Sequence, residues 1–107
     1  MLHLVTTSLD ARIRRAITGK LLVEITYKGR RRVAEPHDYG CIGGVDRLLI
    51  YQLRGLDGTS AKDTRGWRLL DVPKIEALTV LDATFDGSRG GPDQAHHAWD
   101  ALYLRVD

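Results

Sequence analysis

Apolar and polar residues follow two different rhythms along this chain, and the first rhythm is helical. The apolar positions near the start are spaced three and four residues apart, as on one face of a helix: Leu9, Ile13, Ala16 and Ile17. Ser8 or Asp10 can cap the start of such a helix, and Gly19 can end it. We therefore predict an amphipathic leading helix over residues 8–19.

From residue 20 the rhythm changes to the two-residue period of β-strands. Apolar and β-branched residues alternate over residues 21–27, and a glycine-centred turn follows at residues 28–30. A returning strand is expected to end at Pro36, with a bent continuation to residue 42. The remaining expected elements are a turn at 43–44, an apolar strand at 46–53, an exposed loop at 56–65, a strand from residue 67, a turn at 73–74 and a last strand at 77–82.

The strand that begins near residue 67 carries charge at both ends of an apolar row. Arg68, Leu70, Val72 and Lys74 share one face if the two-residue period holds. Two cations at the ends of such a row can place positive charge at the mouth of a barrel. We therefore expect an anion site there.

The end of the chain again has helical spacing. Residues 83–92 have the Gly-rich composition of a flexible linker. After them, the apolar positions repeat as on a helix over residues 93–107: Ala95, Ala98, Trp99, Leu102 and Val106. We predict a C-terminal helix, in which Trp99 covers the bottom of the barrel or docks on a second copy or a partner protein.

Length and composition indicate one globular domain over residues 1–107. The chain has 43% hydrophobic and 28% charged residues, which is ordinary for such a domain and excludes a disordered one. The expected fold is mainly β, within the α+β class: a small, partly open barrel of about five strands over residues 20–82, with a helix before and after it. No apolar run approaches a membrane span of about 18 residues. With no secretory signal expected and the single Cys41, we expect a cytoplasmic protein.

The charge of the chain is unevenly distributed, although its net value is only +2. Residues 12–32 carry a group of bases against the single acid Glu24, and most of these bases are arginine: Arg12, Arg14, Arg15, Lys20, Lys28, Arg30, Arg31 and Arg32. Arginine binds phosphate groups in a bidentate way that lysine cannot match. The pattern therefore indicates an anionic partner, although a solvated helix face and a basic hairpin turn would produce it too.

The order of these elements resembles the WYL domain, an Sm-like (SH3-type) barrel found mostly in bacterial transcription regulators. The resemblance covers roughly residues 9–81 and depends on five features. They are Ala16-Ile17, the apolar strand that ends at Tyr27, Arg31-Arg32-Val33-Ala34-Glu35-Pro36, Leu48-Leu49-Ile50-Tyr51 and Arg68-Leu69-Leu70-Asp71-Val72-Pro73-Lys74-Ile75. The Trp-Tyr-Leu that names the family reads Arg47-Leu48-Leu49 here. We expect no helix-turn-helix before the first helix.

The resemblance implies a non-enzymatic, regulatory, ligand-sensing module that binds a nucleotide or single-stranded nucleic acid. Carried over position by position, it implies Arg32, Arg68 and Lys74 as the basic ligand-binding residues. Tyr27 and Tyr51 are their possible stacking or hydroxyl-donor neighbours, although Tyr27 also fits a core position. Phosphates need cations and bases need aromatic faces, so these residue types suit such a ligand.

Two other function classes remain open. A protein-interaction module would use Trp99 and an open strand edge, and could form a homodimer. A small enzyme would use His37, Asp38 and Cys41, but their closeness on an extended segment does not bring thiol and imidazole together. We expect no cofactor and no metal, because the adjacent His96 and His97 would point to different sides of a helix.

Overall fold

The protein is described here from a computed structural model, and the structure describes residues 7–56, 65–90 and 97–107. In chain order its elements are α1 (Leu9–Gly19), β1 (Leu21–Tyr27), β2 (Arg30–Ile42), β3 (Val45–Gly55), β4 (Gly66–Asp71), the 3₁₀ turn η2 (Val72–Lys74), β5 (Ile75–Thr84) and β6 (Ala101–Arg105). The expected mainly β fold with one leading helix is confirmed. Within the described residues, no helix combines the length and apolar character needed to cross a membrane.

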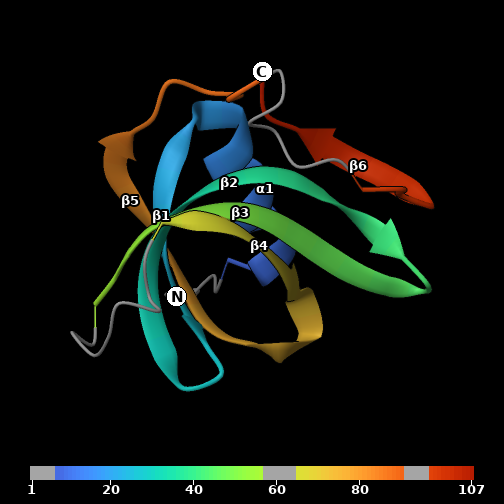
Figure 1. Ribbon diagram of the computed structural model, residues 1–107, viewed down its shortest axis with the longest axis horizontal. Coiled ribbons are helices and arrows are strands. Elements are labelled where there is room, and N and C mark those ends of the chain that lie inside the picture. Colours follow the sequence, from blue (N-terminus) through green and yellow to red (C-terminus); the bar gives the residue numbers. More distant parts are fainter. Residues whose placement is uncertain (1–6, 57–64, 91–96) are drawn as a thin grey trace, which may run out of the picture.

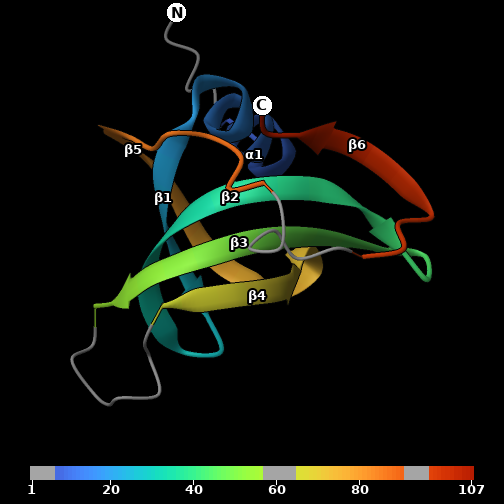
Figure 2. The ribbon, with the colours of Figure 1, turned by 45° about the horizontal axis from the view of Figure 1, so that its top comes forward.

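The strands form one antiparallel sheet that curls strongly but does not close (Figure 1). Its order is β4-β3-β2-β1-β5, and β6 is a further partner of β2. The first half of β2 pairs with β1 and the second half pairs with β6, while β3 follows nearly its whole length. Figure 2 shows α1 at one end of the curled sheet, near β1 and β6. β2 is therefore the strand that joins all parts of the fold.

The helix forms where its apolar spacing predicts it. Ser8 is the N-cap, and its side-chain oxygen accepts a hydrogen bond from the Ala11 N–H at 3.1 Å. Ile13 and Ile17 are fully buried against the inner face of the sheet. The end of the helix differs from the prediction in one detail. Gly19 is the last helical residue, and it is Lys20 that takes the left-handed conformation, with φ 53°.

The inner face of the sheet carries the main core. Alternate residues of β1 and β3 point into it, and they are almost fully buried: Val23, Ile25, Leu48 and Ile50. Leu70 of β4 and Leu78 of β5 complete the same cluster. The outer face of the sheet lies on the side away from this core, and polar side chains can occupy it where no other segment covers it.

The expectation that Pro36 ends the second strand was wrong. β2 continues through it to residue 42, because the pairing with β3 shifts by one residue between Pro36 and Asp38. A proline has no N–H to give to the ladder, and a bulge removes the need for one. His37 is the extra residue of this bulge.

The predicted C-terminal helix over residues 93–107 was also wrong. Residues 101–105 form β6, and the first residues of the expected helix lie outside the described part of the chain. The strand is fixed at both ends by backbone hydrogen bonds, from Asp100 N to Cys41 O and from Val106 N to His37 O. Leu102 and Val106 are four residues apart, and that spacing fits both a helix face and one side of a strand.

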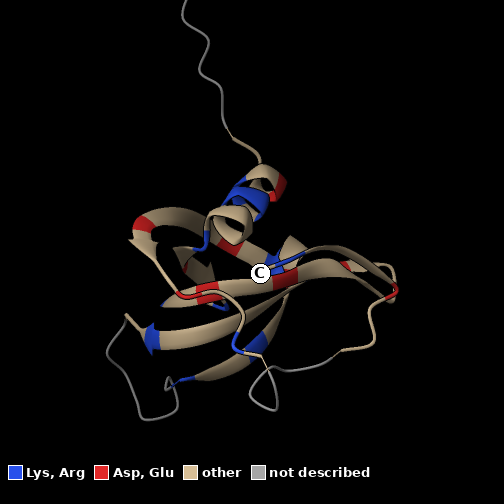
Figure 3. Cartoon of the chain, turned by 90° about the horizontal axis from the view of Figure 1, so that it is seen from above, with Lys and Arg blue, Asp and Glu red and all other residues tan. Residues whose placement is uncertain are grey.

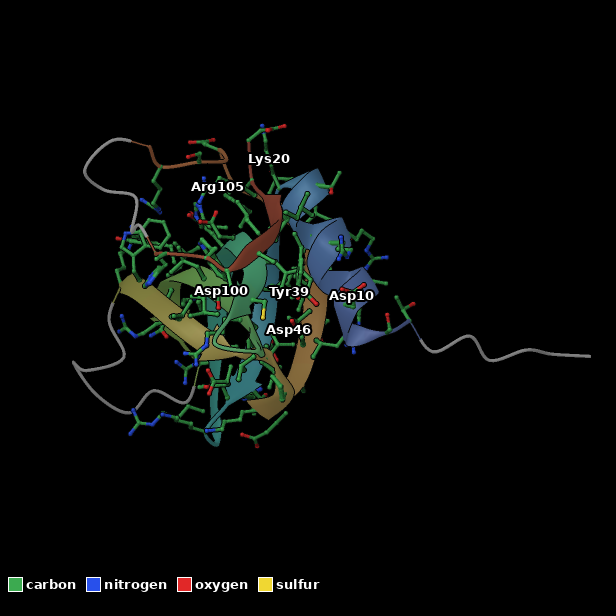
Figure 4. The ribbon with its side chains drawn as sticks, turned by 90° about the vertical axis from the view of Figure 1, so that its right-hand side faces the viewer. Asp10, Lys20, Tyr39, Asp46, Asp100 and Arg105 are labelled. Atoms are coloured by element: carbon green, nitrogen blue, oxygen red, sulfur yellow. The ribbon has the colours of Figure 1, made fainter. Side chains whose placement is uncertain are left out.

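Two tyrosine hydroxyls link elements of the fold. That of Tyr39 joins β2 to α1, and Figure 4 labels Tyr39 and Asp10; that of Tyr103 joins β6 to β3. Tyr39 of β2 donates to Asp10 Oδ1 of α1 at 2.8 Å, and Tyr103 of β6 donates to Asp46 Oδ1 of β3 at 2.7 Å. Burial and the bond to Asp10 raise the pKa of Tyr39, and the bond to Asp46 raises the pKa of Tyr103 to about 12. Both hydroxyls therefore remain protonated donors at neutral pH.

Residues 85–90 belong to the segment 83–92 that was expected to be a flexible linker. They cross the molecule as a strap whose backbone is hydrogen-bonded at two points. Phe85 N donates to Lys20 O, and Ser88 N donates to Asp107 O, both at 2.9 Å. Gly87 has φ +104°, and a Cβ there would lie 2.2 Å from Asp107 O. Only glycine fits this crossing.

Gly40→Ala is expected to detach β6 from β2. A Cβ at residue 40 would lie 2.3 Å from the backbone oxygen of Ala101, so the two strands could not keep their distance. We expect a loss of about 1–3 kcal/mol in the free energy of unfolding, measured by urea denaturation, with faster hydrogen exchange at Asp100 and Val106. Gly19→Ala is the control, because its Cβ would meet only the Leu21 side chain, at 3.3 Å. Unchanged protection in Gly40→Ala would contradict this account.

Candidate functional site

The register of β2, β3 and β4 sorts the predicted site residues onto two faces of the sheet. Arg68 lies opposite Ile50, so both share the inner face. Tyr51 lies opposite Glu35 on one side and Trp67 on the other, so these three share the outer face. The sequence therefore named residues from both faces.

Arg32 and Arg68 lie on the inner face at the same end of the sheet. Arg32 is 8% exposed and donates to Gln52 Oε1 at 3.1 Å and to Tyr27 O at 3.0 Å. Arg68 donates to Trp67 O at 2.9 Å, and its guanidinium lies beside Gly66 at the start of β4. Both cations add positive potential to this end.

Tyr27 contacts Arg32, and Lys74 directly precedes Ile75, the β5 residue that pairs with Tyr27. Tyr27 is 6% exposed and belongs to the core cluster, and its hydroxyl accepts the Asp71 N–H at 3.1 Å. Lys74 of η2 is exposed and lies 3.6 Å from Asp71 Oδ2. Asp71 also pairs with Arg47, so one carboxylate is shared by two cations on this side.

The β3 side of this end is rich in exposed bases. We call them the basic end: Lys28, Arg30, Arg31, Arg54 and Arg65. They come from the β1–β2 hairpin, the end of β3 and the residue before β4. Figure 3 shows basic segments on α1 and again at strand ends on the other side of the molecule. Within the described parts of the chain, no carboxylate pairs with Arg54 or Arg65, and neither residue was singled out from the sequence.

A buried carboxylate organises the outer face next to the basic end. Glu35 is 7% exposed and binds Arg89 of the strap in a bidentate way, with both distances 2.9 Å. Its Oε1 also accepts from His37 Nε2 at 3.0 Å. Charge-assisted, bidentate hydrogen bonds of this kind are among the strongest in proteins. Arg89 therefore attaches the strap to β2.

The same guanidinium lies over an aromatic ring. The Arg89 Cζ is 3.6 Å from the centroid of Tyr51, which is stacking distance. Trp67 meets the Tyr51 ring edge-on at 5.1 Å and the His37 ring edge-on at 4.8 Å. With the two bonds of Glu35, these contacts connect the side chains of Glu35, Arg89, Tyr51, Trp67 and His37 into one closed cluster.

His37 is neutral in this arrangement. Burial lowers its pKa, while the hydrogen bond and charge of Glu35 oppose the shift. An ionised carboxylate can only accept, so Nε2 carries the proton and Nδ1 is the deprotonated nitrogen. Nδ1 is buried without a hydrogen-bond partner, so a second proton would have no acceptor there.

A cleft of about 240 Å³ lies beside this cluster. It is lined by Glu35 and by the strap residues Asp86, Gly87, Ser88 and Arg89. The cleft therefore borders Arg89, and two acidic residues, Glu35 and Asp86, are among its lining residues.

The residues of the alternative enzyme hypothesis do not assemble. Asp38 binds Arg105 in a bidentate way at 3.0 Å, and His37 points to Glu35. Cys41 lies four residues further along β2, which is about 13 Å of strand.

The described residues hold no group of three or more potential metal ligands. His96 lies outside them, and His97 contacts the Trp99 ring.

Stability is expected to fall as the pH drops below about 6.5, because of His37. Its pKa is lower in the folded protein than its ordinary 6.5, so the unfolded chain takes up the proton first as the pH falls. Urea denaturation of the protein and of His37→Gln, at about pH 7.5 and about pH 5.5, measures this. The parent protein should lose more stability than the variant. An equal loss in both would show that His37 is not the titrating group.

Comparison of the chain with protein-family models, with curated proteins and with solved structures gave no match. The geometry described above therefore carries the functional argument.

Proposed function

We propose that this protein is a regulatory module that binds single-stranded nucleic acid or a nucleotide through the basic end of its sheet. The observation that carries the proposal is the basic end itself: exposed cations from three separate segments converge there. Arg32 and Arg68 lie behind them on the inner face and strengthen the same positive potential. Phosphate is the anion that such a set of guanidinium groups fits best.

Aromatic side chains next to the basic end favour a ligand that carries bases. Tyr51 and Trp67 lie on the outer face, within three residues of Arg54 and Arg65 along their strands. Proteins that bind single strands combine a basic surface with aromatic rings on which bases stack. A duplex would hide its bases from these rings.

We further propose that the curled sheet is an SH3-type barrel related to the WYL domain, acting in the cytoplasm. The strand order β4-β3-β2-β1-β5, the leading helix and the short 3₁₀ turn between β4 and β5 support this. The motifs at residues 31–36 and 68–75 fall on β2 and on β4 to β5, as the resemblance implies.

A protein-interaction role is the second candidate, and β6 supports it. Among the described residues, the exposed large hydrophobic side chains are Leu102 and Tyr103, 41% and 40% exposed. β6 has β2 as its one strand partner in the described parts of the chain. However, the pairing shifts at Tyr103, and such a bulge weakens an edge as a docking site.

Binding of an oligothymidylate of about twelve nucleotides should weaken steeply with salt. Each phosphate contact removed should lower the slope of log affinity against log salt concentration by about 0.7 for a single strand. We expect this change for Arg54→Ala and for Arg65→Ala, measured by fluorescence anisotropy over a salt series.

Arg15→Ala is the matched control for these variants, because it removes one exposed arginine from α1. Its slope should equal that of the parent protein. Equal effects of all three variants would mean that net charge alone, and not the basic end, drives binding. Absence of binding at low salt would refute the proposed function.

If β6 docks on a second copy, the protein should dimerise with rising concentration. Leu102→Lys places a charge on the edge strand and should abolish the dimer, as seen by sedimentation equilibrium. Thr79→Lys, at an exposed position of β5, is the control. A protein that stays monomeric at all concentrations would remove the homodimer from consideration.

A further inference from the structure

We propose that Arg89 is a removable cover on a base-stacking site, and that the Tyr51 ring is that site. This inference depends on the proposed function, since it names what the same surface accepts beyond phosphate. The ligand class is a single strand with an unpaired base, which displaces the Arg89 guanidinium from Tyr51 and stacks in its place.

The position of the guanidinium defines the site. Its Cζ lies 3.6 Å from the Tyr51 ring centroid, the separation at which a flat group stacks on an aromatic face. Trp67 lies nearly perpendicular to the same ring, with 5.1 Å between the ring centroids, whereas the Arg89 guanidinium lies directly over the ring. A nucleobase is also flat and needs the same face. Base and guanidinium therefore compete for one surface.

The site lies within reach of the basic end and on the same face of the sheet. Arg54 is opposite Val33, and Tyr51 is opposite Glu35, two residues further along β2. Opposite residues share a face, and so do alternate residues of one strand. Arg54 and Tyr51 are thus both on the outer face, about 10 Å apart along β3. One strand of nucleic acid can use both.

Arg89 can leave without breaking the fold. Its side chain is 30% exposed, and the strap is fixed by backbone bonds at Phe85 and Ser88 that do not involve Arg89. A phosphate of the bound strand can replace Glu35 as its bidentate partner. Asp86 lines the same cleft and offers another. Glu35 keeps its bond to His37 when Arg89 moves.

The cover makes binding selective. A ligand with phosphates alone gains nothing on Tyr51 that repays the loss of the Glu35–Arg89 pair. A ligand with a base gains a stack on the Tyr51 ring in addition to its phosphate contacts. The closed cover thus discriminates against bare polyanions.

The test is the charge-neutral double variant Glu35→Gln/Arg89→Ala. It removes one negative and one positive charge together and leaves no buried carboxylate without a partner. Affinity for the oligothymidylate, measured by fluorescence anisotropy, should rise at least about fivefold, because the base no longer competes with Arg89. Affinity for inorganic polyphosphate, measured by competition, should stay the same. Adding Tyr51→Leu to the double variant should remove the gain.

The matched control is Asp10→Asn/Arg14→Ala, which removes an exposed ion pair on α1 without changing net charge. It should bind both probes like the parent protein. If Glu35→Gln/Arg89→Ala binds the oligothymidylate no better than the parent, the cover is refuted and the salt-dependent binding of the basic end still stands. If neither the parent nor the double variant binds at low salt, the proposed function fails and this inference fails with it.

Discussion

The carboxylate of Glu35 constrains the whole outer face of the sheet. A buried charge is costly unless hydrogen bonds replace its lost water, and Glu35 obtains them from His37 on β2 and from Arg89, 54 residues later in the chain. That need adds a side-chain bond to β2 from a strap that backbone hydrogen bonds at Phe85 and Ser88 already hold in place. It also fixes the Arg89 guanidinium over Tyr51, and the neutral tautomer of His37 follows from the same carboxylate.

The arginines of this chain perform separate tasks, so their number alone does not locate the anion site that we propose. Arg12 of α1 donates to Leu78 O of β5, and Arg105 of β6 binds Asp38. Arg89 binds Glu35. These side chains hold the fold together, so their guanidinium groups are largely engaged by partners within the protein. The positive potential available to a ligand comes mainly from the basic end, where Arg54 and Arg65 extend from the sheet.

Local sequence patterns predicted the leading helix and most strands well. The features that they failed to predict depend on contacts between residues far apart in the sequence. The helix and the first strands follow from apolar periodicity, which depends on near neighbours in sequence. The C-terminal helix was wrong because β6 is set by its pairing with β2, where Gly40 leaves room for the Ala101 backbone. The Arg89–Tyr51 contact had no local signal, since Arg89 lies in a Gly-rich segment. The sequence predicted Arg32, Arg68 and Tyr51 as site residues, but it did not predict which face of the sheet each of them occupies.

Those faces depend on a one-residue irregularity that sequence patterns do not show. Gln52 and Arg54 are two residues apart on β3 and would share a face in a regular strand. The pairing with β2 shifts there, so Gln52 lies opposite Ala34 while Arg54 lies opposite Val33. Gln52 consequently points inward and is 1% exposed, whereas Arg54 joins Tyr51 on the outer face. The bulge thereby places the Arg54 cation and the Tyr51 ring on one surface, which is the arrangement that the proposed binding of a single strand requires.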